Sequence, residues 1–439
     1  MLRFGTDGVR GRAYKDIFPE DFNRLAQAAA HVLQPKAPVV IGRDTRQSSP
    51  DFAHALMAGF SAVGVATIDL GVAPTPAVAW AAAYAKTPGV MVSASHNPWK
   101  DNGLKLFSPE GLKLQDDAQA DLEAILTDAN QKPVSTLGTP NRTLDGTDLL
   151  QEYQHFLASS VSFDHNSLSV VVDAANGAAT SLLPMSLQAH GLTVTVINAE
   201  PDGQNINRKC GSTVPGTVAA AVVKHNADIG LTFDGDADRV LATDHTGELV
   251  DGDQIIAICA ADRQERHKLP DSTVVVTVMS NLGFHRAMAE RGITVVTTPV
   301  GDRNVWAALH KGNWALGGEQ SGHVIFPELA TTGDGMVTAL QLLEVLARRK
   351  MPLKELAAEA MTKMPQVLRN VKLGANPIDH QQLSTAIATA EQTLNGSGRL
   401  IVRPSGTEPV IRIMVEAETS QLAQSVAADL AAACVASNS

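Results

Sequence analysis

The chain has 439 residues, of which 44% are hydrophobic and 18% charged, so it is globular and long enough for two to four domains. Its formal net charge of −11, without any Lys/Arg run, argues against nucleic acid as a partner. The sequence shows no apolar leader, no apolar run near the ~18 residues of a membrane span and no C-x-x-C pattern among its three cysteines. We therefore expect a cytoplasmic protein without a disulfide framework, a zinc site or membrane contact.

The first third of the chain alternates between strand and helix patterns. Apolar runs and helical spacing predict strands at 39–42, 65–69 and 89–93 and helices at 21–33 and 75–84. Another helix is expected to start with Ser49 as N-cap and Pro50 at its first position, and to end at Gly64. This alternation is typical of an α/β layer with a largely parallel sheet, in which active loops follow the carboxyl ends of strands.

Three further units follow the Pro/Gly/Thr-rich stretch at 132–148, which marks a boundary. Strands are expected at 168–173, 193–197, 227–233, 274–278 and 293–296, with helices opening at 174–177 and at 336–349. After Pro365, helices at 381–394 and 421–433 accompany strands at 399–402 and 410–416. We predict three α/β domains with mixed or parallel sheets at 1–148, 149–251 and 252–365, and a smaller α+β domain at 366–439.

The stretch Ser93-Ala94-Ser95-His96-Asn97-Pro98 directly follows an apolar strand. A strand end holds a residue in place and the following loop exposes it, as a nucleophilic hydroxyl requires. Ser95 has His96 beside it and Lys105 downstream, which favours such a role. A serine hydrolase is disfavoured because the G-x-S-x-G elbow is absent. An ordinary surface turn rich in Ser and Asn remains an equal alternative from these residues alone.

A metal site is predicted at Asp234, Asp236 and Asp238, which follow the predicted strand 227–233. Alternating carboxylates project to one side of an extended chain, and oxygen-only ligands favour Mg²⁺ over Zn²⁺. A calcium EF-hand loop is excluded, since its sixth position would be Arg239 and its twelfth His245. A solvated acidic turn is disfavoured because adjacent carboxylates repel one another unless a cation binds them.

Three further patterns are candidates for binding a phosphate or a sugar. Arg403-Pro404-Ser405-Gly406-Thr407 combines hydroxyls, a guanidinium and glycine-freed N–H groups, the parts of an anion nest, and Arg412 on the next strand can face it. Glu319 and Ser321 can both bind vicinal sugar hydroxyls, although this signal is weak by itself. Arg10, in the glycine-rich FGTDGVRG, can face a phosphate or be a solvated arginine in a turn.

Together these segments resemble, in order, the signature loops of the α-D-phosphohexomutases. SASHNP resembles the active-serine loop, DGDADR the metal loop, GEQSGH the sugar loop and RPSGTEP the phosphate loop. FGTDGVRG, PDGQNIN and VGDR also fit, so the resemblance covers essentially the whole chain. It implies four domains around a central cleft, each contributing one loop.

The implied activity is that of an isomerase, an intramolecular phosphotransferase. Ser95 would carry a phosphoryl group as phosphoserine, and a sugar bisphosphate would form as the intermediate. Mg²⁺ and a sugar 1,6-bisphosphate activator are the implied cofactors. Gln320 stands where glucose- and mannose-phosphate enzymes tend to carry Met, which favours glucosamine 6-phosphate and glucosamine 1-phosphate as the substrates. The product would feed UDP-N-acetylglucosamine and cell-wall precursor synthesis, and the family suggests a homodimer.

The resemblance also assigns roles to single residues. The metal ligands would be Ser95, Asp234, Asp236 and Asp238, the supporting cations Arg10, Lys105 and Arg239, and the proton carrier His96 or Lys105. Substrate binding would fall to Glu319, Ser321, His323, Arg303, Arg403, Ser405, Gly406, Thr407 and Arg412. Two alternatives stay open: a preference for glucose or mannose phosphate, and a non-catalytic phosphosugar sensor, which would be expected to lose Ser95 or an aspartate.

Overall fold

The computed structural model describes residues 4–5, 8–127, 142–162, 168–372, 380–404 and 410–436. The chain divides into two compact units. The larger comprises Met1–Met279 and Ile293–Ala360, and the smaller comprises Ser280–Gly292 and Met361–Ser439. The larger unit holds three sheets and the smaller unit holds one.

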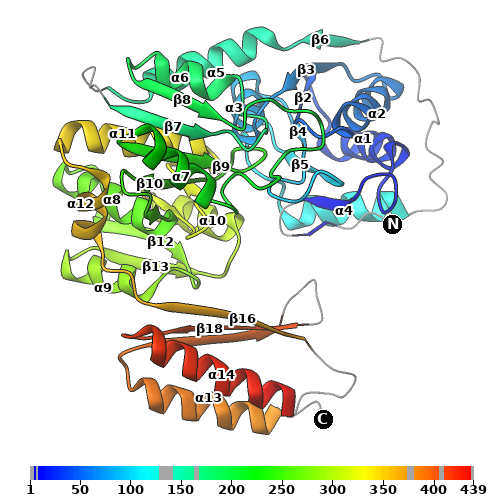
Figure 1. Ribbon diagram of the computed structural model, residues 1–439. Coiled ribbons are helices and arrows are strands. Elements are labelled where there is room, and N and C mark those ends of the chain that lie inside the picture. The colour runs from blue at the N-terminus through cyan, green and yellow to red at the C-terminus, as the bar shows by residue number, and fades with distance from the viewer. Residues whose placement is uncertain are drawn as a thin grey trace. The chain divides into compact units, whose positions relative to one another are not determined.

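The first sheet of the larger unit has six strands in the order β1-β5-β4-β2-β3-β6 (Figure 1). Its elements are β1 (Val9–Arg12), α1 (Pro19–Leu33), β2 (Val39–Arg43), α2 (Ser49–Ala62), β3 (Thr67–Val72), α3 (Thr75–Ala85), β4 (Gly89–Val92), β5 (Asp101–Phe107), α4 (Asp116–Thr127) and β6 (Thr143–Asp145). β2 runs parallel to β3 and β4, whereas β5 runs antiparallel to β1 and β4. The sheet is therefore mixed, because the chain returns as β5 directly after the serine loop.

Helix α2 begins differently from the prediction. Ser48 is the N-cap, and Ser49 is already the first helical residue. The Ser49 hydroxyl donates to Asp44 Oδ1 at 2.6 Å, so it is used in the loop that precedes the helix. The predicted cap was thus wrong by one residue, because a tertiary contact takes the side chain that local sequence assigns to capping.

The second sheet has the order β11-β10-β9-β7-β8. Its elements are α5 (Thr147–Ser159), β7 (Ser169–Asp173), α6 (Leu182–Gln188), β8 (Thr193–Ile197), α7 (Gly216–His225), β9 (Ile229–Phe233), β10 (Val240–Asp244) and β11 (Leu249–Val250). The helix predicted to open at 174–177 is wrong, since α6 starts only at Leu182. Ala175 and Asn176 adopt φ angles of 54° and 49°, which a right-handed helix excludes.

The third sheet has the order β13-β12-β14-β15. Its elements are α8 (Gly252–Glu265), β12 (Thr273–Thr277), β13 (Thr294–Thr298), α10 (Asp302–Gly312), β14 (Gly317–Gly318), β15 (Val324–Ile325), α11 (Gly335–Arg349) and α12 (Leu353–Ala360). β12 is parallel to β13 and β14, and β14 turns back antiparallel into β15. The GEQSGH segment therefore forms the connection of a short hairpin.

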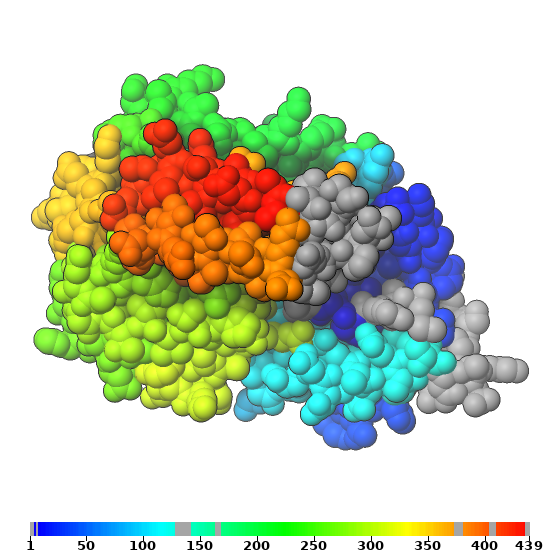
Figure 2. All heavy atoms as spheres, turned by 90° about the horizontal axis from the view of Figure 1, so that it is seen from below, coloured from blue at the N-terminus to red at the C-terminus, as the bar shows by residue number. Residues whose placement is uncertain are grey.

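The smaller unit is an antiparallel sheet, β16-β18-β17, with helices α13 and α14 packed on one face (Figure 1). Its elements are α9 (Leu282–Glu290), β16 (Gln366–Lys372), α13 (His380–Leu394), β17 (Arg399–Pro404), β18 (Val410–Glu416) and α14 (Ser420–Ala436). The two helices run side by side at the surface (Figure 2). The predicted fold class, three α/β layers and a small α+β domain, is confirmed. None of the helices in the described ranges has both the length and the apolar character needed to cross a bilayer.

A buried hydrogen bond joins α5 to the start of α11. The Tyr153 hydroxyl donates to Asp334 Oδ2 at 2.7 Å, and both side chains are buried. Asp334 Oδ1 caps α11 by accepting from the amides of Met336 and Val337. Burial raises the pKa of Asp334 to about 6 despite these hydrogen bonds.

Asp334 gives a testable pH dependence. Its folded-state pKa exceeds the unfolded value of about 3.9, so the native protein binds the extra proton between about pH 4 and 6. The free energy of unfolding therefore keeps its full value below this window. It falls by up to about 3 kcal/mol as the pH rises through it. We expect Asp334→Asn, which keeps a capping oxygen, to flatten the fall in thermal midpoint measured by scanning calorimetry between pH 4 and 7. Parallel curves for variant and parent would contradict this account.

Candidate active site

Ser95 lies in the loop after β4 and is almost fully buried, with 1% of its surface exposed. Its φ angle of 51° falls in the left-handed region, which is unusual for a non-glycine residue. Its hydroxyl donates to Asp234 Oδ2 at 2.5 Å and lies 3.4 Å from His96 Nδ1. The structure thus brings the predicted nucleophile, one predicted metal ligand and one predicted proton carrier together.

The three aspartates among the predicted metal ligands form one buried group in the turn between β9 and β10. Asp234, Asp236 and Asp238 each offer an oxygen, and these oxygens lie within 4.8 Å of one another. Oδ1 of Asp236 and Oδ1 of Asp238 are buried without a hydrogen-bond partner. Buried carboxylate oxygens left in this way fit a bound divalent cation, and an oxygen-only donor set suits Mg²⁺.

Lys105, on β5, balances part of this negative charge. Its Nζ lies 2.8 Å from Asp236 Oδ2 and 2.6 Å from Asp238 Oδ2. Burial, together with repulsion by Asp238 and Asp236, raises the pKa of Asp234 well above its usual range. Burial has the same tendency at Asp238, but Lys105 and other cationic groups outweigh it and hold the pKa of that carboxyl well below its usual range. The site therefore contains one carboxyl with a raised pKa, that of Asp234, and one with a lowered pKa, that of Asp238.

Two of the predicted cations, Arg10 and Arg239, act electrostatically on His96. Arg10, on β1, lies opposite Gly103 of β5, and the Arg239 amide donates to Asp234 Oδ1 at 3.2 Å. Burial, followed by the positive charges of Arg239 and Arg10, lowers the pKa of His96 to about 4. His96 is therefore neutral near pH 7 and can accept a proton.

Glu319 and Ser321 lie in the hairpin between β14 and β15. Glu319 Oε1 accepts a hydrogen bond from the Gly301 amide at 3.1 Å, which connects the sugar loop to the VGDR segment. The guanidinium of Arg303 reaches α4 of the first sheet layer, where it bonds Asp116 Oδ1 at 2.7 Å. Ser321 Oγ is buried and has no hydrogen-bond partner. The hydrogen-bonding capacity of this hydroxyl is thus unused among the described contacts, and its contact with a sugar stays a prediction.

His323 is placed against carboxylates. Only 2% of its surface is exposed, and its ring nitrogens lie 3.8 Å from Asp238 Oδ2 and 3.4 Å from Asp302 Oδ2. Burial lowers its pKa, but Asp238 and Asp302 outweigh this and raise it above the ordinary value. The side chain thus connects the sugar loop to the aspartate group, while a direct contact with a sugar stays a prediction.

The predicted phosphate loop belongs to the smaller unit. Ser405, Gly406 and Thr407 lie outside the described residues. Arg403 of β17 and Arg412 of β18 are direct cross-strand neighbours, and the Arg412 side chain is exposed. Two guanidiniums at adjacent positions at one end of a strand pair fit the predicted anion grip.

Two site contacts were missed by sequence reasoning. Thr75, the first residue of α3, donates its hydroxyl to Asp236 Oδ2 at 2.5 Å and its amide to the Asp236 carbonyl. Lys113 forms an ion pair with Asp302, which in turn lies beside His323. Nothing in the local sequence indicates these contacts, because Thr75 and Lys113 meet Asp236 and Asp302, which are far away along the chain, only after folding.

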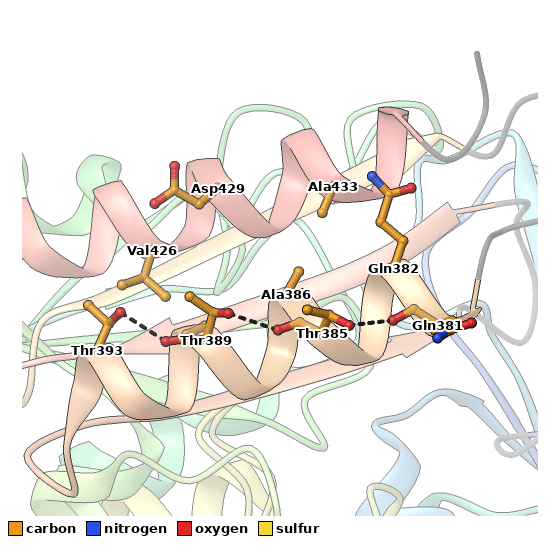
Figure 3. Close-up of a pocket in the computed structure, with 10 residues that line it drawn as sticks. Gln381, Gln382, Thr385, Ala386, Thr389, Thr393, Val426, Asp429 and Ala433 are labelled. Atoms are coloured by element: carbon orange, nitrogen blue, oxygen red, sulfur yellow. Dashed lines mark hydrogen bonds between the residues drawn. The ribbon is translucent and has the colours of Figure 1, made fainter.

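A groove of about 630 Å³ between α13 and α14 makes no part of this site (Figure 3). Thr385, Thr389 and Thr393 line it, and each hydroxyl donates to the carbonyl one turn earlier on its own helix. The threonines therefore present methyl groups to the groove. Among the described residues that line it, Asp429 is the one with a charged side chain, and these residues do not form a convergent polar group like the aspartate site.

Comparison with known families identifies the class of protein. Models of phosphoglucomutase/phosphomannomutase alpha/beta/alpha domains I, II and III match residues 1–133, 151–247 and 251–364, and that of the C-terminal domain matches 347–433. With the buried serine and aspartates, they define a phosphohexomutase: the chain belongs to the phosphoglucomutase/phosphomannomutase family. The resemblance seen in the loop motifs is confirmed.

Within this family, relatives that are about half identical to the chain are phosphoglucosamine mutases. The phosphoglucosamine mutase of Frankia alni is 50% identical, covering 98% of this chain and 97% of its own length. That of Pelotomaculum thermopropionicum is 48% identical with coverage of 94% and 95%, and that of Rhodococcus jostii is 45% identical with coverage of 98% of both chains.

Solved structures agree at the level of fold. A phosphoglucomutase/phosphomannomutase family protein of Burkholderia thailandensis superposes with a TM-score of 0.82 at 25% identity, covering 98% of this chain and 97% of its own. N-acetylphosphoglucosamine mutase of Aspergillus fumigatus, crystallised with GlcNAc-6P and magnesium, reaches a TM-score of 0.68 at 19% identity, with coverage of 100% and 96%. The latter likeness concerns the fold alone.

Proposed function

We propose that this protein interconverts glucosamine 6-phosphate and glucosamine 1-phosphate, the activity of a phosphoglucosamine mutase. The observation that carries the proposal is the Ser95 hydroxyl, 2.5 Å from Asp234 within a buried trio of aspartates. Such a site suits phosphoryl transfer, in which catalysis consists of positioning and charge neutralisation. Relatives of the same family that are 45–50% identical carry this name.

In the proposed reaction, Ser95 starts as phosphoserine. A free hydroxyl of the substrate attacks phosphorus, the bond between Ser95 Oγ and phosphorus breaks, and the hydroxyl proton passes to His96 or Lys105. The resulting bisphosphate turns over, its other phosphoryl group bonds to Ser95 Oγ, and the released sugar oxygen takes up the proton. Mg²⁺ bound by Asp234, Asp236, Asp238 and the serine phosphate would neutralise charge on the moving phosphoryl group.

The remaining predicted residues would hold the substrate. Arg10 and Arg239 would support the transferring phosphoryl group, and Glu319, Ser321, His323 and Arg303 would contact the sugar or its immediate supports. Arg403, Ser405, Gly406, Thr407 and Arg412 would grip the phosphate that is not reacting. A single grip that serves both phosphates explains why the sugar must turn over while the phosphate site stays the same.

Further parts of the proposal follow from the family. The domains would be 1–148, 149–251, 252–365 and 366–439, each contributing one loop. A sugar 1,6-bisphosphate would prime unphosphorylated Ser95. The protein would act in the cytoplasm, as a homodimer, in the supply of UDP-N-acetylglucosamine for cell-wall precursors. A non-catalytic sensor is disfavoured because Ser95 and all three aspartates are retained.

The test is a coupled assay that compares glucosamine 6-phosphate with glucose and mannose phosphates at equal Mg²⁺ and a trace of the matching 1,6-bisphosphate. We expect the highest kcat/KM for the amino sugar. Substitution of Gln320 by Met should then shift the preference towards glucose phosphate. If the parent instead has a higher kcat/KM for glucose or mannose phosphate, the proposed phosphoryl-transfer reaction still holds, but the proposed substrate is wrong.

A further inference from the structure

The backbone of Ser95 is held in its left-handed conformation by side chains from two sheets. Such a conformation persists in a non-glycine residue only when the surroundings impose it. Both polar groups of the Ser95 peptide backbone are bonded to side chains. The amide donates to Ser93 Oγ at 2.9 Å, and the carbonyl accepts from Arg46 Nη2 at 2.8 Å and from Asn207 Nδ2 at 2.9 Å.

Arg46 is the centre of this support. Its side chain is fully buried, and its Nε bonds Asp44 Oδ2 at 2.7 Å. The two terminal nitrogens donate to four carbonyls of the serine loop, those of Ser95, Asn97, Pro98 and Asp101, at 2.5–3.0 Å. One planar guanidinium therefore fixes seven consecutive residues of the loop, from 95 to 101.

Asp44 connects the guanidinium to the amide side of Ser95. Its Oδ2 accepts from Ser93 Oγ at 2.7 Å, and that same hydroxyl receives the Ser95 amide. Its Oδ1 accepts from the Arg46 amide at 3.0 Å and from Ser49 Oγ. Each oxygen of the Asp44 carboxylate thus accepts two hydrogen bonds, and the negative charge of Asp44 neutralises the positive charge of Arg46.

Asn207 reaches the same loop from the second sheet layer. Its Nδ2 donates to the carbonyls of Ser95 and Asn97, the two carbonyls that Arg46 Nη2 also binds. The serine loop is consequently clamped from both sides, by Arg46 within its own layer and by Asn207 across from it.

We propose that Arg46 is a positioning residue for phosphoryl transfer, with Asp44 and Asn207 completing the clamp on Ser95. The inference rests on the proposed function and adds residues to it. Only a guanidinium has a flat array of donors that can reach several carbonyls at once, whereas lysine has a single nitrogen. Releasing the loop would move Ser95 Oγ, and a displacement near 1 Å at a reacting atom costs about 100-fold in rate.

A buried arginine could instead support folding only, so the test needs a matched control. Arg263 is 6% exposed, bonds Glu328 at 2.7 Å and Gln341 at 3.1 Å, and lies over the Phe326 ring, with no contact to the serine loop. Arg46→Lys and Arg263→Lys each replace the guanidinium of a buried arginine, which has several N–H donors, by a single ammonium group. The donors of Arg46 hold the serine loop, whereas those of Arg263 bond Glu328 and Gln341.

The experiment measures three quantities for the parent, Arg46→Lys, Arg263→Lys and Asn207→Ala. These are the single-turnover rate at which the phosphorylated protein transfers its phosphoryl group to saturating glucosamine 6-phosphate, the KM, and the thermal midpoint. We expect Arg46→Lys to lower the rate by about 100-fold with little change in KM. Asn207→Ala should lower it less, and Arg263→Lys should keep the parental rate even where its midpoint falls equally.

A parental rate in folded Arg46→Lys would overturn the inference. If Arg46→Lys fails to fold, Asn207→Ala decides alone, since it removes two loop hydrogen bonds without altering the buried charge. A parent that transfers nothing to any hexose phosphate would instead refute the proposed function, and the inference with it. If the parent prefers another hexose phosphate, the same four proteins are compared with that substrate.

Discussion

Replacement of Ser95 by alanine is expected to lower mutase activity by more than about 10⁴-fold, since it removes the atom that carries the phosphoryl group. No neighbouring hydroxyl in the described site can substitute. Ser93 Oγ donates to Asp44 and accepts from the Ser95 amide, so it is committed to the support of the loop. The measurement is a steady-state assay with glucosamine 6-phosphate, Mg²⁺ and bisphosphate activator.

The control for this variant is Ser108→Ala, because Ser108 lies just after β5 in the same layer and its hydroxyl bonds only the nearby Glu110 among the contacts described. We expect Ser108→Ala to keep parental activity. Ser95→Ala should also keep its thermal midpoint within a few degrees, so that the loss is chemical. Retention of even a tenth of the parental kcat by folded Ser95→Ala would refute a phosphoserine mechanism.

Substitution of Asp234 by asparagine is expected to have opposite effects on activity and stability. Without metal, folding must bury Asp234 beside Asp236 and Asp238, at the cost of either desolvated charge or proton uptake at neutral pH. Asparagine avoids this cost and keeps an acceptor for the Ser95 hydroxyl. We therefore expect the metal-free variant to unfold at least about 2 °C above the parent.

The same variant should lose the response to metal. Mg²⁺ is expected to raise the thermal midpoint of the parent, because it binds only the folded site, and to have little effect on Asp234→Asn. Activity should fall by about 10³-fold or more, as should that of the parent after chelation. Asp121→Asn, at an exposed position on α4, serves as the control and should behave as the parent. A Mg²⁺-dependent midpoint that survives Asp234→Asn would contradict the assignment of this carboxylate.

The alternation of strands and helices could be predicted because it follows from local hydrophobic periodicity. Strand β1 could not: FGTDGVRG is glycine-dense and reads as a turn, and β1 is stabilised by pairing with β5, 89 to 95 residues later in the chain. The return of the chain as β5 also makes the first sheet mixed, which no local pattern indicates.

The site was predictable where its chemistry is concentrated in short motifs. The spacing of Asp234, Asp236 and Asp238 placed three carboxylates on one turn, and they do form one buried group. Residues that act across layers could not be found in this way. Arg46 and Thr75 belong to local sequences that indicate no such role. Asn207 ends the PDGQNIN segment, but that pattern does not indicate a contact with the serine loop. The contacts of all three with the serine and aspartate loops exist only in the folded chain.

The most direct test follows the phosphoryl group on Ser95 itself. The protein is phosphorylated with glucose 1,6-bisphosphate, freed of excess sugar and mixed with an equimolar amount of glucosamine 6-phosphate, and the peptide that contains Ser95 is analysed by mass spectrometry against time. The account predicts that phosphate is present on Ser95 at the start and leaves it as glucosamine 1,6-bisphosphate appears. Turnover of glucosamine 6-phosphate without phosphate ever present on Ser95 would contradict it.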